Sequence, residues 1–267
     1  MKQTQDGRQN PEEVGIFSFI DRSIQFFTAG ESHQRINNII LGPLERPALQ
    51  WLAARMPAWV TPDSLTGLAL AASLLIFAGY VLTNLDKGFL WLASLGFVIN
   101  WFGDSLDGTL ARFRHIERPR YGFFIDHTLD AFSEVLIFMG VGLSPYVSFN
   151  IACVALVGYL MLAIMVYITT YVNGVFRISY IKLGPTEMRV IAILANTVVF
   201  FLGNPVLHLP FGVVSFYNLV IIVLSVLFFG AFVVVTFTQA SELNKIDRGN
   251  LPPKKRRRVR RAAPRLP

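Results

Sequence analysis

The chain contains a single cysteine, Cys153, and only four histidines among its 267 residues. One cysteine excludes a disulfide framework, and it also excludes a zinc site built from cysteines. Charged residues are scarce as well, at 15% of the chain, whereas an ordinary soluble domain has about 25%. Hydrophobic residues make up 53% of the sequence, and this composition predicts an integral membrane protein.

The first residues also lack the pattern of a secretory signal. Residues 1–13 are polar and mixed in charge, without the cationic start and the short apolar core that define such a signal. Insertion is therefore expected to rely on the membrane spans themselves. Residues 1–43 are predicted to be an N-terminal segment, and the loop charges described below predict that it is cytoplasmic.

Long apolar runs, by contrast, are abundant. Six segments reach or approach the roughly 20 apolar residues that a helix needs to cross a bilayer: residues 64–83, 89–110, 123–143, 149–172, 188–202 and 216–237. We predict an all-α integral membrane protein in which residues 44–240 form a membrane domain with six transmembrane helices.

The Lys and Arg residues of the short loops predict how the chain is oriented. Every second connection is basic: Arg112, Arg114, Arg118 and Arg120 lie in one, and Arg177, Lys182 and Arg189 in another. The alternate connections, at 84–88, 144–148 and 203–215, contain only Lys87. With six spans, all basic connections share one side, so both termini and the inner ends of the second and third spans are predicted to be cytoplasmic.

The strongest charge lies at the end of the sequence. Residues 241–267 have ten Lys/Arg and two Asp/Glu, a net charge of +8 in a chain whose total is +7. Because this segment has few apolar residues, it is predicted to be a disordered basic cytoplasmic tail. Since it follows an apolar segment, it indicates binding to anionic lipid rather than to nucleic acid.

A shorter segment before the first span has the spacing of an amphipathic helix. Leu44, Ala48, Leu52 and Met56 recur every four residues, and charged residues occupy other positions of the turn. This spacing predicts a helix that lies in the membrane interface. A simple structural lead-in to the first span is the alternative.

Four aspartates interrupt two of the apolar segments. Asp104 and Asp107 share one helical face with two small residues, Gly108 and Ala111, while Asp126 and Asp130 are spaced four apart after Gly122. One carboxylate at the centre of a spanning helix costs about 2.5–3.5 kcal/mol on insertion scales. Such a group needs partners, and the short connection between the two segments makes them antiparallel neighbours whose carboxylates converge.

Oxygen ligands without a His or Cys cluster favour a hard cation, here Mg²⁺ or Mn²⁺. Four carboxylates suit two ions, an arrangement used for displacement at phosphorus. The small residues leave room for a substrate near the backbone, and Arg112 adds a guanidinium suited to a phosphate. In the alternative interpretation, the aspartates cap helix ends or pair with loop arginines.

The pattern D-x2-D-G-x2-A-R-x9-G-x3-D-x3-D, from Asp104 to Asp130, resembles the signature of the CDP-alcohol phosphotransferases (CDP-alcohol phosphatidyltransferases). This family usually has eight residues between the Arg and the second Gly, whereas the present chain has nine. The resemblance implies a six-helix core, an active site on the inner side of the membrane and a homodimer. It also implies a phospholipid-synthesising transferase that moves a substituted phosphate from a CDP-linked donor to an alcohol acceptor and releases CMP.

The resemblance carries roles to individual positions. It implies that Asp104, Asp107, Asp126 and Asp130 hold two divalent ions, that Asp130 also deprotonates the acceptor hydroxyl, and that Gly108, Ala111, Arg112 and Gly122 contact the CDP portion. The family's P-N-x-L-T stretch corresponds to P-D-S-L-T here, so Thr66 is expected to contact the nucleotide, while Asp63 departs from the pattern.

A second likeness concerns the choline and ethanolamine phosphotransferases, which use diacylglycerol as the acceptor. The stretch T-Y-V-N-G-V-F-R at 170–177, followed by Thr186 and Glu187, is similar to part of these enzymes, as is the pair Asp126-His127. His127 therefore competes with Asp130 as the base, since imidazole titrates near neutral pH. Arg177 and Arg189 are either ordinary loop cations or ligands for a phosphate of the acceptor or donor lipid.

Several alternatives stay open from the sequence. Within the family, the signature fits a diacylglycerol choline- or ethanolaminephosphotransferase as well as a phosphatidylglycerol-phosphate or phosphatidylinositol-phosphate synthase. Outside it, a membrane prenyltransferase also uses aspartate-rich helices, and a cation transporter also places carboxylates in the membrane. The prenyltransferase gives no role to the Asp-Gly-x2-Ala-Arg element. A transporter is expected to place its carboxylates at several depths of the bilayer, whereas here they cluster toward one face.

Overall fold

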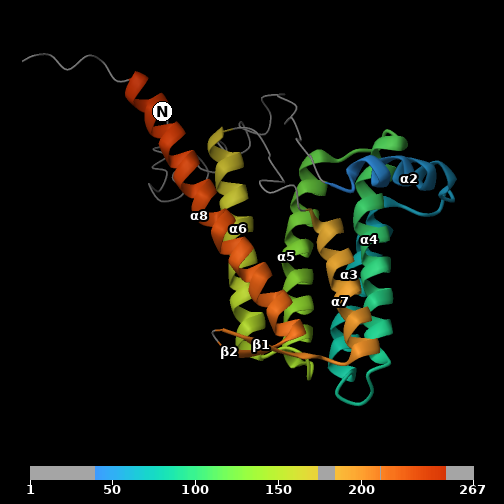
Figure 1. Cartoon of the computed structure of the whole chain (residues 1–267). Helices are drawn as coiled ribbons and strands as arrows, with labels where there is room; N and C mark the ends of the chain where they lie inside the picture. Colours follow the sequence, from blue (N-terminus) through green and yellow to red (C-terminus); the bar gives the residue numbers. More distant parts are fainter. Residues whose placement is uncertain (1–39, 174–183, 211, 251–267) are drawn as a thin grey trace, which may run out of the picture.

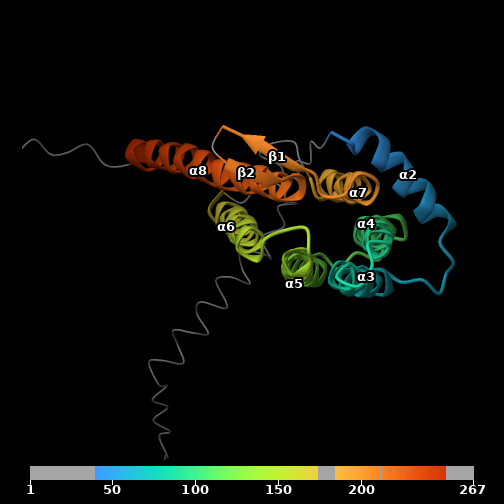
Figure 2. The same ribbon diagram turned by 60° about the horizontal axis from the view of Figure 1, so that its bottom comes forward.

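The computed structural model of the chain describes residues 40–173, 184–210 and 212–250. The elements of these residues are α2 (Gly42–Arg55), α3 (Pro62–Leu82), α4 (Phe89–Phe113), α5 (Pro119–Leu143), α6 (Phe149–Asn173), α7 (Pro185–Leu202), β1 (Val206–Leu209), β2 (Gly212–Ser215) and α8 (Phe216–Asn250). The helices from α3 to α8 stand side by side, with α2 across one end and the two strands at the other (Figure 1). Figure 2 shows α6 beside α8, α3 beside α4, and α5 between α6 and α3.

Five helices are long and apolar enough to cross a membrane: Pro62–Leu82, Phe89–Phe113, Phe149–Val172, Pro185–Leu202 and Phe216–Arg248. Their number and hydropathy agree with the predicted membrane protein. The helix α5 has 25 residues, but Asp126, Asp130 and Glu134 make it less apolar than the other five. The sixth span therefore stays a prediction.

Three helices begin earlier than their apolar segments. The apolar segments begin at residues 64, 123 and 188, whereas α3, α5 and α7 begin at Pro62, Pro119 and Pro185. Proline suits the first turn of a helix because its missing N–H would have no intrahelical partner there. At α3, Thr61 adds a capping box, in which it exchanges hydrogen bonds with Ser64.

Two local features differ from what the sequence predicts. Residues 203–215, expected to be a plain connection, contain an antiparallel hairpin in which Val206 pairs with Ser215 and Leu209 with Gly212. Their β-branched and leucine side chains favour strands, and the run is too short for a span. In addition, α8 continues to Asn250, through the first ten residues of the segment predicted as a tail; residues 251–267 lie outside the described part.

The helix α2 exists where the sequence predicts one, but its buried face differs from the predicted stripe. Leu49 and Ala53 are buried against α4, whereas Leu44 is 76% exposed. The carboxylate of Glu45 explains the orientation, because its Oε1 accepts hydrogen bonds from Trp101, Ser105 and Thr186. The helix is thus fastened to α4 and α7 by a polar group, which a count of apolar positions does not detect.

The helices α3 and α4 pack closely because glycines line their contact. A Cβ atom on Gly79 would lie 2.7 Å from the backbone nitrogen of Ala93, and one on Gly103 would lie 2.6 Å from the carbonyl oxygen of Leu65. Deeper in the bundle, the hydroxyls of Tyr80 and Tyr217 both donate to Asn196 Oδ1. Asn196 Nδ2 in turn donates to Ser94 of α4. This bond and the glycine contacts fix the position of α4, and therefore of the aspartates near its end.

Candidate active site

The four aspartates lie on α4 and α5, in the half of the bundle where α2 lies (Figure 1). Both helices pack extensively on α3, while α4 and α5 make little direct contact with each other. The two helices are thus neighbours through α3: glycines of both α3 and α4 allow those two helices to approach closely, and α5 also packs on α3. The carboxylates face each other across a space that backbone packing does not fill.

Within this space the four carboxylates form one electrostatic unit. Each of the six pairs among Asp104, Asp107, Asp126 and Asp130 interacts electrostatically. The side chains of Asp104 and Asp130 also lie within hydrogen-bonding reach of each other. Two carboxylates at such a distance repel unless a proton or a cation lies between them, so the arrangement is suited to positive ligands.

Asp107 is the most buried of the four, with 6% of its surface exposed. Its Oδ2 accepts a hydrogen bond of 2.6 Å from Thr66 Oγ1, and its Oδ1 accepts one from the backbone N–H of Gly108. Thr66 lies one turn into α3. The structure thus brings Thr66, which was expected to contact the nucleotide, into direct contact with an expected metal ligand.

Asp104 is paired with a cation from α7. Arg189 Nη2 donates to Asp104 Oδ2 at 2.6 Å, and Arg189 Nε donates to Asn100 Oδ1 at 2.8 Å. The buried Nη1 of Arg189 has no hydrogen-bond partner among the described residues. From the sequence, Arg189 is expected to be a loop cation or a phosphate ligand. Its pairing with Asp104, 85 residues away in the sequence, is not among the expectations.

The acidic stripe of α5 extends one turn further than predicted. Glu134 follows Asp130 at a spacing of four residues and interacts electrostatically with Arg189, Asp130 and Asp104. Sequence reasoning missed Glu134, although the repeated spacing of four was a signal that would have found it. The stripe therefore has three acids, of which Glu134 lies deepest in the helix.

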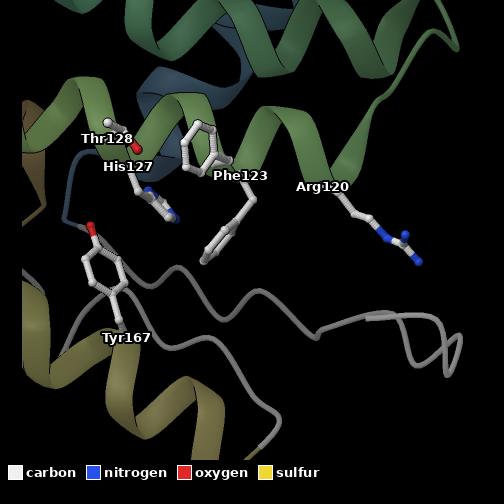
Figure 3. A pocket seen from close by; sticks show the side chains of 6 residues that line it. Arg120, Phe123, His127, Thr128 and Tyr167 are labelled. Carbon is white, nitrogen blue, oxygen red and sulfur yellow. The ribbon is translucent and has the colours of Figure 1, made fainter. Parts of the chain in front are cut away.

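His127 lies on the adjacent face of α5. Its Nδ1 is 4.0 Å from Asp130 Oδ2, and its ring packs against Phe123, with 4.2 Å between ring centroids, and against Tyr167 of α6 at 5.4 Å. These rings border a cavity of about 380 Å³ in which Tyr167 points from α6 towards α5, as Figure 3 shows. The aromatic contacts hold His127 beside Asp130, so both candidate bases lie at one place.

A separate cavity of about 330 Å³ opens between α3, α4 and α5. We call it the first cavity, and it is distinct from the cavity beside His127 and Tyr167 described above. Its lining includes most of the predicted site residues: Thr66, Asp107, Gly108, Ala111, Gly122 and Asp126. A Cβ atom at Gly122 would meet no atom within 4 Å, so this glycine leaves open space. Arg112 does not line the cavity; it is exposed, donates to Thr109 Oγ1, and has its guanidinium beside Gly108.

A second cavity, of about 210 Å³, lies between α5, α6, α7 and α8. His127, Asp130, Glu134, Tyr159 and Tyr167 supply polar groups, and most of the other lining residues are apolar, such as Phe138, Leu162 and Phe228. Asp130 thus borders the second cavity, while Asp107 and Asp126 border the first. The carboxylate cluster therefore lies between the first cavity and the second cavity.

The donor chemistry fits a hard divalent cation, since carboxylate oxygens are the ligands that Mg²⁺ and Mn²⁺ prefer. As the described side chains stand, however, no three His, Cys, Asp or Glu residues are gathered around one point to hold a metal ion. The ion pair of Asp104 with Arg189 and the bonds of Asp107 direct two of the carboxylates to protein partners. Arg177, the other expected phosphate ligand, lies outside the described residues.

Comparison with known proteins gives the family of the chain and several relatives. The family model of CDP-alcohol phosphatidyltransferase matches residues 59–236. The chain is similar to cholinephosphotransferase 1 of Danio rerio, with 28% identity over 57% of this chain and 41% of that protein. It is also similar to phosphatidylinositol phosphate synthase of Cutibacterium acnes, with 36% identity over 34% of this chain and 41% of that protein.

An archaeal relative is matched over more of its length. Archaetidylinositol phosphate synthase of Methanothermobacter thermautotrophicus is 28% identical over 61% of this chain and 78% of that protein. By contrast, the chain spans about two fifths of the length of the first two relatives. The family match extends across α4 and α5, and it therefore includes the four aspartates.

Proposed function

The chain belongs to the CDP-alcohol phosphatidyltransferase family, and from this we propose that it transfers a substituted phosphate from a CDP-linked donor to the hydroxyl group of an alcohol and releases CMP. The observation that carries the proposal is the meeting of four carboxylates from α4 and α5 between two cavities. One cavity suits the donor and the other suits the acceptor. The product is a phospholipid if either substrate carries acyl chains.

The first cavity is the proposed donor site. Its volume of about 330 Å³ is within the usual range of about 300–1,000 Å³ for ligand sites. Gly108, Ala111 and Gly122 leave its wall open for close approach to the backbone. Arg112, beside Gly108, adds positive charge for the diphosphate, and Thr66 completes the set of donor contacts carried over from the family.

Asp104, Asp107, Asp126 and Asp130 are the proposed ligands of two Mg²⁺ or Mn²⁺ ions. When bound, the ions supply positive charge that offsets the charge of the diphosphate in the transition state. Thr66 orients Asp107 through its hydrogen bond, and Arg189 orients Asp104. The buried Nη1 of Arg189 is a donor suited to a phosphate oxygen, which supports the proposed phosphate contact at this residue.

The second cavity is the proposed acceptor site. Asp130 takes the proton of the acceptor hydroxyl, the hydroxyl oxygen bonds to the β-phosphorus of the donor, and the bond from this phosphorus to the CMP oxygen breaks. His127, with Nδ1 4.0 Å from Asp130 Oδ2, is the second candidate for the base. Glu134 adds negative charge at the same wall and helps to hold Arg189 in place.

The lining of the second cavity favours one acceptor class. No Lys or Arg is among the described residues that line it, and its wall is mainly apolar. An acceptor that carries its own phosphate needs a cation, whereas a neutral lipid alcohol needs apolar walls and a hydroxyl acceptor. We therefore favour a diacylglycerol-like acceptor, as in a choline- or ethanolaminephosphotransferase, over glycerol phosphate or inositol phosphate.

The membrane arrangement belongs to the same proposal. The helix α5 is proposed as the sixth span, since it stands among five apolar helices (Figures 1 and 2). The cluster and both termini are then cytoplasmic, with α2 in the interface and the basic tail on anionic lipid. A homodimer is expected from the family.

The test is CMP release by the purified protein with Mg²⁺ and a panel of CDP-linked donors and acceptors. We expect release with a CDP-alcohol and diacylglycerol. A preference for CDP-diacylglycerol with inositol phosphate would reverse the acceptor assignment but keep the reaction. If the protein instead released no CMP with any pair of substrates and carried metal ions into liposomes without nucleotide, the enzyme assignment would be wrong and a cation transporter would be the better assignment.

A further inference from the structure

The first turn of α2 carries a carboxylate that joins three helices. Glu45 Oε1 accepts hydrogen bonds from Trp101 Nε1 at 2.8 Å and from Ser105 Oγ at 3.1 Å, both on α4. It also accepts a hydrogen bond of 2.8 Å from Thr186 Oγ1 of α7. We call these four residues the α2 junction. Because a carboxylate makes shorter and stronger hydrogen bonds than a neutral acceptor, this one oxygen with three donors holds the first turn of α2 to both α4 and α7.

On α4, the donors of the α2 junction alternate with the partners of Arg189. Asn100 Oδ1 accepts from Arg189 Nε at 2.8 Å, and Asp104 Oδ2 accepts from Arg189 Nη2 at 2.6 Å. Trp101 and Ser105 directly follow these two residues in the sequence. Two sets of bonds therefore join the same stretch of α4 to the start of α7, one through Arg189 and the other through the α2 junction.

The start of α7 is held by the α2 junction and by a second contact with α2. Thr186 lies three residues before Arg189, so the two side chains are neighbours on the helix surface. Glu187 is buried: its Oε1 accepts from the backbone N–H of Leu41, at the start of α2, at 2.8 Å, and its Oε2 accepts from the N–H of Gly184 at 2.9 Å. Beyond these contacts α7 packs mainly on α4. The first turns of α7, and with them Arg189, are therefore held between α2 and α4.

We propose that Glu45 is a positioning residue for the transfer reaction: it sets the position of Arg189 and, through Arg189, the orientation of the Asp104 carboxylate. This inference rests on the proposed function, in which Asp104 is a metal ligand and Arg189 contacts a phosphate. It makes α2 part of the active-site structure. It also gives roles to Thr186 and Glu187, which the likeness to the choline and ethanolamine phosphotransferases includes and the reaction itself leaves unused.

The test separates positioning from stability by comparing Glu45→Gln with Leu49→Ala in the full-length protein. Glu45→Gln keeps the size of the side chain but removes the charge that strengthens its bonds, so kcat/KM for CMP release with Mg²⁺ is expected to fall roughly tenfold. Leu49 is buried where α2 packs on α4. Leu49→Ala is expected to lower the thermal unfolding midpoint in detergent by roughly 5–15 °C, more than Glu45→Gln does, and to change kcat/KM by less than about twofold.

Thr186→Val isolates the bond between α2 and α7. It removes the hydroxyl that donates to Glu45 and leaves the two bonds from α4 in place, so kcat/KM is expected to fall roughly three- to tenfold. Thr197→Val, on the same helix, is the matched control and is expected to keep the wild-type value, because among the described residues the Thr197 hydroxyl bonds only to the Ile193 carbonyl. Thr186→Val also provides the comparison with Leu49→Ala if Glu45→Gln does not fold.

Combination with Arg189→Lys shows whether Glu45 acts through Arg189. A lysine keeps the charge but lacks the forked donors of a guanidinium, so Arg189→Lys alone is expected to lower kcat/KM roughly 10- to 100-fold. Adding Glu45→Gln to Arg189→Lys is expected to lower kcat/KM by less than about threefold more, because the effects of residues in one network are not additive.

The outcomes separate this inference from the proposed function. A further loss of about tenfold in the double variant would show that Glu45 acts independently of Arg189, and the inference would be overturned. Wild-type kcat/KM in Glu45→Gln, or an equal loss in Leu49→Ala, would overturn it as well, while CMP release by the wild type would leave the proposed function standing. If the wild type releases no CMP from any CDP-linked donor, the proposed function itself is wrong and the inference fails with it.

Discussion

At the scale of single residues, three of the four carboxylates lie beside a partner that orients them. Asp107 is held by Thr66 and the N–H of Gly108, Asp104 by Arg189, and Asp130 lies beside His127. These partners orient groups that would otherwise repel each other. Substitutions that keep side-chain volume but remove one partner test each role.

Thr66→Val removes the hydroxyl that donates to Asp107 and keeps the shape of the side chain. A hydrogen bond to a charged group is worth about 1.5–3 kcal/mol, so we expect kcat/KM for CMP release to fall roughly 10- to 100-fold. Thr197→Val is the matched control, because among the described residues the Thr197 hydroxyl bonds only to the Ile193 carbonyl of its own helix. Equal activities of the two variants would remove Thr66 from the site.

The identity of the base is tested by comparing Asp130→Asn with His127→Asn at saturating substrate. General-base catalysis contributes about 10²–10⁴-fold. We expect kcat to fall at least a hundredfold in Asp130→Asn and less than tenfold in His127→Asn, because His127 acts by holding Asp130. The reverse order in steady-state kinetics would assign the proton transfer to His127.

At the scale of the elements, the close contact of α3 with α4 places the cluster. Gly103→Ala is expected to destabilise the protein by roughly 1–3 kcal/mol, the usual cost of overpacking, because the new Cβ atom would lie 2.6 Å from the Leu65 carbonyl oxygen. Gly67→Ala, with no atom within 4 Å of its Cβ atom, is expected to leave stability unchanged or raise it. Thermal unfolding in detergent measures both, and equal midpoints would contradict the packing argument.

The elements also show what the sequence could predict. Apolar runs predicted the five long helices, and five of the eight signature residues line the first cavity, whereas Asp104, Arg112 and Asp130 do not. The starts of α3, α5 and α7 were missed because proline is not apolar enough to extend a run. The hairpin was missed because four-residue strands carry little periodic signal. The Arg189–Asp104 pair was missed because it depends on the packing of helices distant in sequence.

At the scale of the whole molecule, the proposal requires α5 to cross the membrane despite its acids. In a Cys153→Ala background, single cysteines at Glu117 and Asp86 lie in connections at opposite ends of α4. We expect an impermeant thiol reagent to label Glu117→Cys from the cytoplasmic side and Asp86→Cys from the other side. A third variant, Pro145→Cys, places the cysteine just beyond the end of α5. It is expected to be labelled from the same side as Asp86→Cys, and labelling from the same side as Glu117→Cys would show that α5 does not span the membrane.

The most direct test of the central claim is Mg²⁺-dependent CMP release from a CDP-linked donor, measured for the wild type and for Asp126→Asn. The carboxylate of Asp126 lies in the cluster and borders the first cavity, and the substitution preserves its size. The account predicts CMP release by the wild type that stops when Mg²⁺ is chelated, and a loss of at least a hundredfold in Asp126→Asn. CMP release that is independent of divalent ions, or undiminished in the variant, would contradict it.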